Sequence, residues 1–273
     1  MNYQAVNLGW QDFIPGRDYL LDLSSITAFP LITSNLKYKN SGSTFGKKYV
    51  IKNIKGIRVG ILGIMPENRL NHIIDKNLTD YLTVLPPEPT LAGLIPEVRQ
   101  KADVVILLSQ NGYNATSELL SKVSGIDLAI AGNNQPDELP KCGSKNLVPE
   151  SYERVNNTLI MPARDKGRAL GYIKIKLDKS DNSVIGMEPK EIPLTMDVKM
   201  DSELEKISGS DIYVTAMKEI KESVEKMRAK MEKEFKQLRS YSPEEYFEYV
   251  LSKQRNTKGI MNEKDGEDDR FPE

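Results

Sequence analysis

An uninterrupted apolar run, Val104–Leu108, is followed by the polar cluster Ser109–Asn111 and then by Gly112. Five apolar residues without polar alternation predict a strand that is buried on both faces, as in a parallel sheet. In open α/β sheets, ligands bind outside the carboxyl ends of the strands. We therefore expect Ser109, Gln110 and Asn111 to lie near any functional site.

The segments around this run predict the rest of an α/β core. Asn114–Val123 has helical spacing, and Asp127–Gly132 is a second apolar run that ends in glycine. Together with the first run, they predict a βαβ unit. Two further apolar segments, Tyr49–Ile54 and Ile57–Ile64, flank Lys55-Gly56 and predict a β-hairpin.

The pattern changes after Asn156. Thr158–Met161, Ala169–Leu177 and Val184–Met187 are expected to be antiparallel strands. Apolar residues alternate with lysine in the second of these segments, which predicts one face in contact with water.

A charged helical extension is expected from Asp201. Apolar residues recur at heptad-like spacing between Met217 and Leu238, and Ser242–Glu245 has the pattern of a capping box. The predicted divisions are an α/β domain (1–200), a helical extension (201–254) and a disordered acidic tail (255–273). We expect the amphipathic helix over 210–238 to contact a protein partner or a second copy of the chain.

Composition excludes several classes of function. The net charge of −1 gives no reason to expect nucleic acid or an anionic membrane as a partner. Cys142 is the only cysteine and His72 the only histidine, which excludes an internal disulfide, cysteine-based zinc sites and metal centres built on several histidines. We see no signal peptide and no apolar stretch of about 20 residues, so we expect no membrane span.

Four segments, in this order and spacing, resemble the metallophosphoesterase domain of the 5'-nucleotidase family. They are Leu8–Phe13 with Gly16 (family Gly-Asn-His-Glu-Phe-Asp), Gly56–Gly63 (the hairpin strand), Asp103–Gly112 (Asp-Val-Val-Ile-Leu-Leu-Ser-His-x-Gly) and Ile126–Gln135 (Ile-Asp-x-Ile-Ile-x-Gly-His-x-His). Ala163–Gly171 also resembles the family's return into its second sheet. The resemblance covers about residues 3 to 195 and implies an αββα sandwich, here expected to be truncated at the N-terminus and to lack the first strand.

The resemblance also implies a site with two metal ions that activate water for attack on a phosphate ester. The residues that match the family's ligands have changed. Trp10 stands at an asparagine ligand, and Gln11, Gln110, Asn133 and Gln135 stand at histidines. Side-chain amides are neutral, weak metal ligands and cannot act as general bases near neutral pH. We therefore expect no catalytic residue, no metal ligand and no cofactor in this chain.

Three interpretations of this cleft remain open. It is a packed polar cleft without activity, or it binds a small polar ligand, or it retains a cation or weak hydrolytic site that uses Asp12. The candidate residues are Gln11, Asp12, Ser109, Gln110, Asn111, Asn133 and Gln135. Ser109 has no neighbouring histidine to activate it, so we do not expect a nucleophile.

The sequence therefore predicts a degenerate, non-catalytic phosphoesterase-like domain, a pseudoenzyme that acts as a binding or structural module. The alternative is a divergent metal-dependent phosphoesterase that is completed by sequence or by a partner outside this chain. A divalent metal pair is expected only in that alternative. The sequence leaves open the ligand, the oligomeric state and the compartment, although members of the family are often exported.

Overall fold

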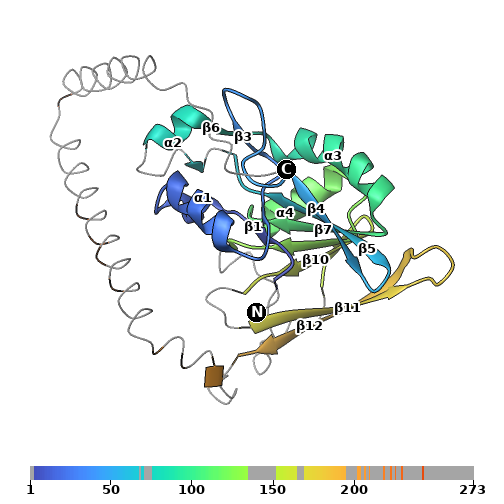
Figure 1. Cartoon of the computed structure of the whole chain (residues 1–273). Coiled ribbons are helices and arrows are strands. Elements are labelled where there is room, and N and C mark those ends of the chain that lie inside the picture. Colours follow the sequence, from blue (N-terminus) through green and yellow to red (C-terminus); the bar gives the residue numbers. More distant parts are fainter. Residues whose placement is uncertain are drawn as a thin grey trace. The chain divides into compact units, whose positions relative to one another are not determined.

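The structure is a computed structural model that describes residues 3–67, 69–70, 76–134, 152–164 and 169–194, and isolated positions between 202 and 242. The chain divides into two compact units, residues 1–197 with 271–273, and residues 198–270. The fold described below is that of the first unit (Figure 1).

The first unit contains short N-terminal elements, a helix-covered sheet and a long C-terminal hairpin. In chain order the elements are β1 (Val6–Asn7), the 3₁₀ helix η1 (Trp10–Phe13), α1 (Arg17–Ile26), β2 (Leu31–Ile32), β3 (Leu36–Tyr38), β4 (Tyr49–Ile54), β5 (Ile57–Ile64), α2 (Lys76–Tyr81), β6 (Leu82–Val84), α3 (Pro87–Lys101), β7 (Val104–Ser109), α4 (Tyr113–Lys122), β8 (Leu128–Ala131), β9 (Arg154–Val155), β10 (Thr158–Pro162), β11 (Ala169–Leu177) and β12 (Val184–Pro193).

A six-stranded sheet with the order β4-β5-β7-β8-β10-β9 forms the centre of the unit. The predicted hairpin is confirmed, since β4 and β5 pair antiparallel around Lys55 and Gly56. Both turn residues have positive φ, as a two-residue hairpin turn requires. The predicted βαβ unit is confirmed as β7–α4–β8, with β7 and β8 paired in parallel. The mixed α/β architecture is therefore as expected.

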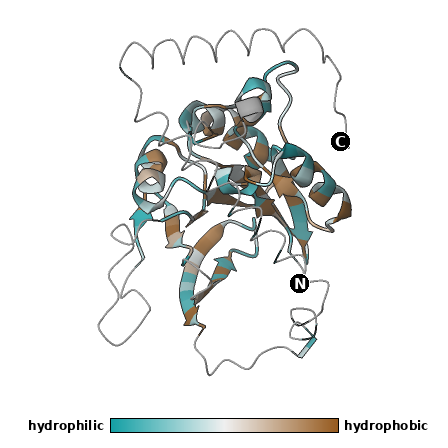
Figure 2. Ribbon diagram, turned by 90° about the vertical axis from the view of Figure 1, so that its left-hand side faces the viewer, coloured by the Kyte–Doolittle hydropathy of each residue, from teal (hydrophilic) through white to brown (hydrophobic). Residues whose placement is uncertain are grey.

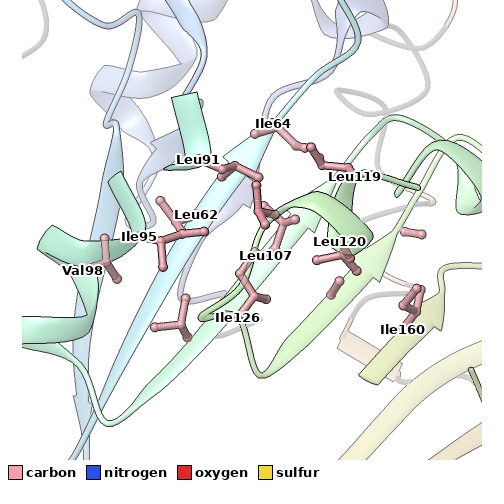
Figure 3. Close-up of a cluster of buried hydrophobic side chains, with 14 of the residues drawn as sticks. Leu62, Ile64, Leu91, Ile95, Val98, Leu107, Leu119, Leu120, Ile126 and Ile160 are labelled. Atoms are coloured by element: carbon pink, nitrogen blue, oxygen red, sulfur yellow. The ribbon is translucent and has the colours of Figure 1, made fainter. Parts of the chain in front are cut away.

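One face of this sheet is covered by α3 and α4. Their apolar side chains form a single continuous core with those of β5, β7, β8 and β10 (Figure 3). Leu107 lies at its centre and is fully buried. Figure 2 shows how hydrophobic residues gather on the central strands. This core explains why the run that begins at Val104 has no polar alternation.

The opposite face is covered by two separate two-stranded pieces. The β1–β2 pair packs through Ile32 on Val50 and Ile61, and the β11–β12 hairpin packs through Ile173 and Met187 on Leu128, Leu159 and Met161. A further cluster joins α1 and η1 to β2, β3 and β6. Helices and strands thus form the layers that an αββα sandwich requires.

The prediction for β10 was wrong in direction. We expected Thr158–Met161 to be one of a series of antiparallel strands, but β10 pairs in parallel with β8 along Leu159–Pro162. Only its short contact with β9 is antiparallel. The strand is buried at all five positions, which is the pattern of a parallel sheet interior rather than of a sheet with one wet face.

The remaining predictions for the C-terminal part stay predictions. The helix over 210–238, the capping box and the acidic tail lie largely outside the described residues. Within the part of the chain that the structure describes, no helix is long and apolar enough to cross a membrane.

The core on the helix-covered face can be tested by removing the Leu107 side chain. We expect Leu107→Ala to lower the free energy of unfolding by about 2 to 5 kcal/mol, because it leaves a cavity in a fully buried cluster. Urea unfolding followed by circular dichroism measures this change. Ile26→Ala is the control, since Ile26 is 80% exposed and should change stability by less than about 0.5 kcal/mol. Equal losses in the two variants would contradict the assigned core.

Candidate functional site

The candidate site lies at the carboxyl ends of β5, β7 and β8, which meet at one edge of the sheet. The Gln110 amide donates to the Ile64 carbonyl oxygen, and the Gly132 amide donates to that of Ser109. The end of β1 is fixed at the same edge, because Asn7 Nδ2 donates to the carbonyl oxygens of Ile64 and Leu108, both at 3.0 Å. The segments that follow β1, β5, β7 and β8 therefore lie side by side.

Gln11 and Asp12 lie on η1, the single 3₁₀ turn that follows β1. Gly9 is the residue before η1, and its amide donates to Asp12 Oδ2 at 2.7 Å. Such a contact satisfies one of the amides that a helix start leaves unpaired. Asp12 is therefore held by its own turn.

Gln110 closes the site from the opposite strand. Its Oε1 accepts from the Trp10 amide at 3.0 Å, and its Nε2 donates to Gln11 Oε1, also at 3.0 Å. The Gln110 side chain lies directly on the backbone of Gly9. A Cβ at residue 9 would lie 1.6 Å from Gln110 Nε2, so any larger residue there would displace the end of the Gln110 side chain.

Asn133 joins the third loop to this network. It follows β8 with a φ of 59°, in the left-handed region that asparagine tolerates better than most residues. Its Nδ2 donates to the main-chain carbonyl oxygen of Gln110 at 3.3 Å. Gln11, Asp12, Gln110 and Asn133 are thereby brought together, whereas Gln135 lies outside the described residues.

Ser109 is not part of this group. It is 3% exposed and lies on the same face of β7 as Leu107, toward α4. Its Oγ lies 2.7 Å from Thr116 Oγ1, and because the Thr116 hydroxyl donates to the Gly112 carbonyl oxygen, Ser109 is the donor in this pair. The Asn111 amide also donates to Ser109 Oγ, at 3.3 Å. Ser109 therefore fixes the start of α4.

Two asparagines that contribute to the site were missed in the sequence. Asn7 holds β1 against the sheet, and Asn134 Nδ2 donates to the carbonyl oxygens of Ala131 and Ala163. Asn7 lies within a short apolar segment, and Asn134 lies shortly after an apolar run. This placement is a sequence signal that could have identified them. Among the described residues, Asn7 Oδ1, Asn111 Oδ1, Asn134 Oδ1 and Trp10 Nε1 are buried without a hydrogen-bond partner.

Electrostatics single out Asp12. Withdrawal from solvent raises the pKa of its carboxyl group, and the hydrogen bond from the Gly9 amide opposes this shift. The Asp12 residue as a whole is exposed, although its Oδ2 accepts the hydrogen bond from the Gly9 amide.

The described residues do not fit a pair of divalent metal ions. They contain no group of three or more histidine, cysteine, aspartate or glutamate side chains that could hold a metal ion. The oxygens of Gln11 and Gln110 already accept hydrogen bonds, and Asp12 is held by Gly9. The unpartnered amide oxygens are neutral, and a dinuclear centre needs anionic or imidazole ligands.

No family model matches the sequence, but individual proteins do. The trifunctional nucleotide phosphoesterase protein YfkN of Bacillus subtilis is 27% identical over 205 residues, which are 67% of this chain and 14% of that protein. The 5'-nucleotidase of Bos taurus is 25% identical over 201 residues, which are 67% of this chain and 34% of that protein. The chain therefore spans a minor part of the length of these relatives.

Solved structures give the same result for the fold. The crystal structure of calcineurin-like phosphoesterase YfkN from Bacillus subtilis matches 83% of this chain and 72% of its own, with a TM-score of 0.64 and 23% identity. The chain's homologues are members of the 5'-nucleotidase and calcineurin-like phosphoesterase family. A 5'-nucleotidase precursor from Thermus thermophilus matches 76% of this chain and 42% of its own, with a TM-score of 0.60 and 20% identity. The metallophosphoesterase-like fold of the 5'-nucleotidase family, expected from the sequence motifs, is confirmed.

The hydrogen bonds of Gln110 can be tested by truncation. We expect Gln110→Ala to lower the free energy of unfolding by about 1 to 2 kcal/mol, because the Trp10 amide then loses its acceptor. Gln11→Ala removes only the exposed end of the network and should have a smaller effect. Chemical unfolding of both variants measures the difference. An equal or larger loss in Gln11→Ala would contradict the bridging role of Gln110.

The raised pKa of Asp12 has a consequence for stability. A carboxyl group with a raised pKa in the folded state favours folding when protonated, and this contribution is lost as the pH rises through the titration. We therefore expect the stability of Asp12→Asn, relative to the unchanged protein, to increase between about pH 3 and pH 6. Unfolding free energies measured across this range provide the test, with Asp80→Asn as a control for the loss of one charge. A difference that falls with pH would contradict the shift.

Proposed function

We propose that this chain is a degenerate, non-catalytic phosphoesterase-like domain that acts as a binding or structural module. The family relationship supplies the fold and the position of the cleft. The proposal concerns what the cleft does, and it depends on the chemistry of the side chains found there.

The observation that carries the proposal is the double hydrogen bond of Gln110. One end of its amide accepts from the main chain of Trp10, and the other donates to the side chain of Gln11. The side chain also fills the space above Gly9. A residue that must bind metal or substrate presents its polar atoms to the cleft, whereas Gln110 uses them within the chain. This is the arrangement of a structural contact.

The other groups at the cleft do not replace the lost chemistry. Asp12 is the carboxylate of the group, and it is bonded to the amide of its own turn. The Ser109 hydroxyl is buried and donates to Thr116, away from Gln110. Neither can activate a water molecule for attack on phosphorus without a partner base or metal ion. Gln11, Asp12, Gln110, Asn111 and Asn133 remain candidates for contacts with a small polar ligand.

Phosphate release from AMP in the presence of manganese tests the proposal. We expect the purified chain to release no more phosphate than an enzyme-free blank, because the described residues contain no group of three or more histidine, cysteine, aspartate or glutamate side chains that could hold a metal ion. The Bacillus subtilis relative YfkN serves as the positive control in the same assay. Metal content after incubation with manganese or zinc should be far below one ion per chain.

A comparison of two variants distinguishes activity of this chain from activity of a contaminating phosphatase. Manganese-dependent release that disappears in Gln110→Ala but persists in Ile26→Ala would overturn the proposal and support a divergent hydrolase completed from outside this chain. Release that is equal in both variants would come from a contaminant, and the proposal would stand.

A further inference from the structure

A cavity of about 580 Å³ lies at the amino ends of β7 and β8. Asp103 and Asp127, which directly precede these two strands, line it together with the turn between β9 and β10 and the start of β12. The candidate functional site lies at the carboxyl ends of the same strands, so the two places are distinct. We call the cavity the amino-edge cleft. Pockets that hold small ligands usually measure about 300 to 1,000 Å³, and the cleft is of this size.

Two ion pairs neutralise the carboxylates of the cleft. Arg99 of α3 places its Nη2 atom 2.8 Å from Asp127 Oδ2. Asp103 binds the guanidinium of Arg58, with 2.6 Å between Asp103 Oδ1 and Arg58 Nη2. Each carboxylate thus has one arginine as its partner, and these four side chains together carry no net charge.

Arg154 of β9 is the remaining charged residue of the cleft lining. It lies directly across from Leu159 of β10, and cross-strand partners point to the same face of a sheet. Since Leu159 packs on the β11–β12 hairpin, the Arg154 side chain points toward the hairpin as well. Among the described residues Arg154 has no hydrogen-bond or ion-pair partner. Its guanidinium is therefore available to an anion, and a planar carboxylate matches it with two parallel hydrogen bonds.

Asp127 keeps one carboxylate oxygen open. Its Oδ2 accepts from the Val105 amide at 2.7 Å and pairs with Arg99, whereas its Oδ1 accepts no hydrogen bond from the described residues. The Asp127 side chain is 18% exposed, so this oxygen can accept from a bound ammonium group. Strand β10 alone separates Asp127 from Arg154, which places the two main chains about 10 Å apart, or two strand spacings. One small molecule can therefore contact both side chains.

The third wall of the cleft is apolar. Val184, Ile185 and Met187 at the start of β12 supply it. The register of the hairpin shifts here, because Leu177 pairs with Val184 and Lys176 with Gly186, which leaves Ile185 as the extra residue of a bulge. Bulges of this kind turn a side chain into a new direction. Ile185 is 65% exposed and offers an apolar surface at the cleft.

From these three walls we infer that the amino-edge cleft binds a small zwitterion with an apolar side chain, of the size of an amino acid or a dipeptide. Arg154 pairs with the carboxylate of the ligand, and Asp127 Oδ1 accepts from its ammonium group. Ile185 and its neighbours contact the apolar side chain. A ligand with only one of the two charges leaves either Arg154 or Asp127 Oδ1 without its partner. The inference is independent of whether the candidate functional site is catalytic.

NMR titration of the full chain tests the inference. The probes are leucine and leucyl-leucine, which hold the two charges at different separations. We expect at least one of them to give saturable shifts of the amides in 154–157 and 183–187. N-acetylation or C-terminal amidation of that probe should weaken binding by about tenfold or more, because each removes one charge-assisted hydrogen bond. Glycyl-glycine should also bind more weakly, since it has no apolar side chain.

A matched pair of variants locates the binding. Arg154→Ala should weaken it by about tenfold or more, and the fold should be retained because Arg154 has no partner among the described residues. Lys190→Ala removes the same charge from an exposed position of β12 outside the cleft lining, and it should bind as the unchanged chain does. Ile185→Ser should reduce the preference for leucyl-leucine over glycyl-glycine.

Four results would overturn the inference. The first is that neither probe gives saturable shifts in the two segments. The second is that the acetylated and amidated probes bind as tightly as the zwitterion. The third is that Arg154→Ala binds as tightly as the unchanged chain. The fourth is that the shifts gather around Gln11 and Gln110, which would place the binding at the candidate functional site instead.

Discussion

A parallel sheet must exclude water from both of its faces, and this requirement organises the whole first unit. On the face toward α3 and α4 the requirement is met by one continuous core. On the other face it is met by two short layers, each with its own cluster of apolar side chains. The difference is visible in β7, where Val105, Leu107 and Ser109 on the helix side are buried, whereas Ile106 and Leu108 on the other side are half-buried.

The candidate site shows how side-chain amides can join the ends of neighbouring strands in a metallophosphoesterase-like fold. An imidazole can serve as a metal ligand or exchange a proton, whereas an amide can only donate and accept hydrogen bonds at the same time. Gln110 uses both properties to connect β7 to η1, and Asn133 adds a contact from the β8 loop. Side-chain amides at these positions are therefore compatible with the metallophosphoesterase-like fold.

Much of the fold was visible in the sequence because it follows from local rules. Apolar runs that end in small polar residues predicted the hairpin and the β7–α4–β8 unit, and the motif order predicted the metallophosphoesterase-like fold. The pairing of β10 was mispredicted because the direction of a strand depends on a distant partner, β8, rather than on its own residues. The grouping of Gln11 with Gln110 followed from the family motifs, whereas the roles of Asn7 and Asn134 did not, because their partners are carbonyl groups far along the chain. Ser109 lies at the carboxyl end of β7, as predicted. Its side chain, however, is on the face toward α4, where it contacts Thr116.

The contact between Trp10 and Gln110 joins positions 100 residues apart in the chain. Ordering such a contact requires closure of a long loop, which slows folding more than it reduces stability. The segments α3, β7, α4 and β8 are linked by short connections and can assemble first. The N-terminal turn around η1 then docks on a sheet that is already formed. We therefore expect the end of the molecule that carries the candidate site to be the last part to reach its native structure and the first to leave it.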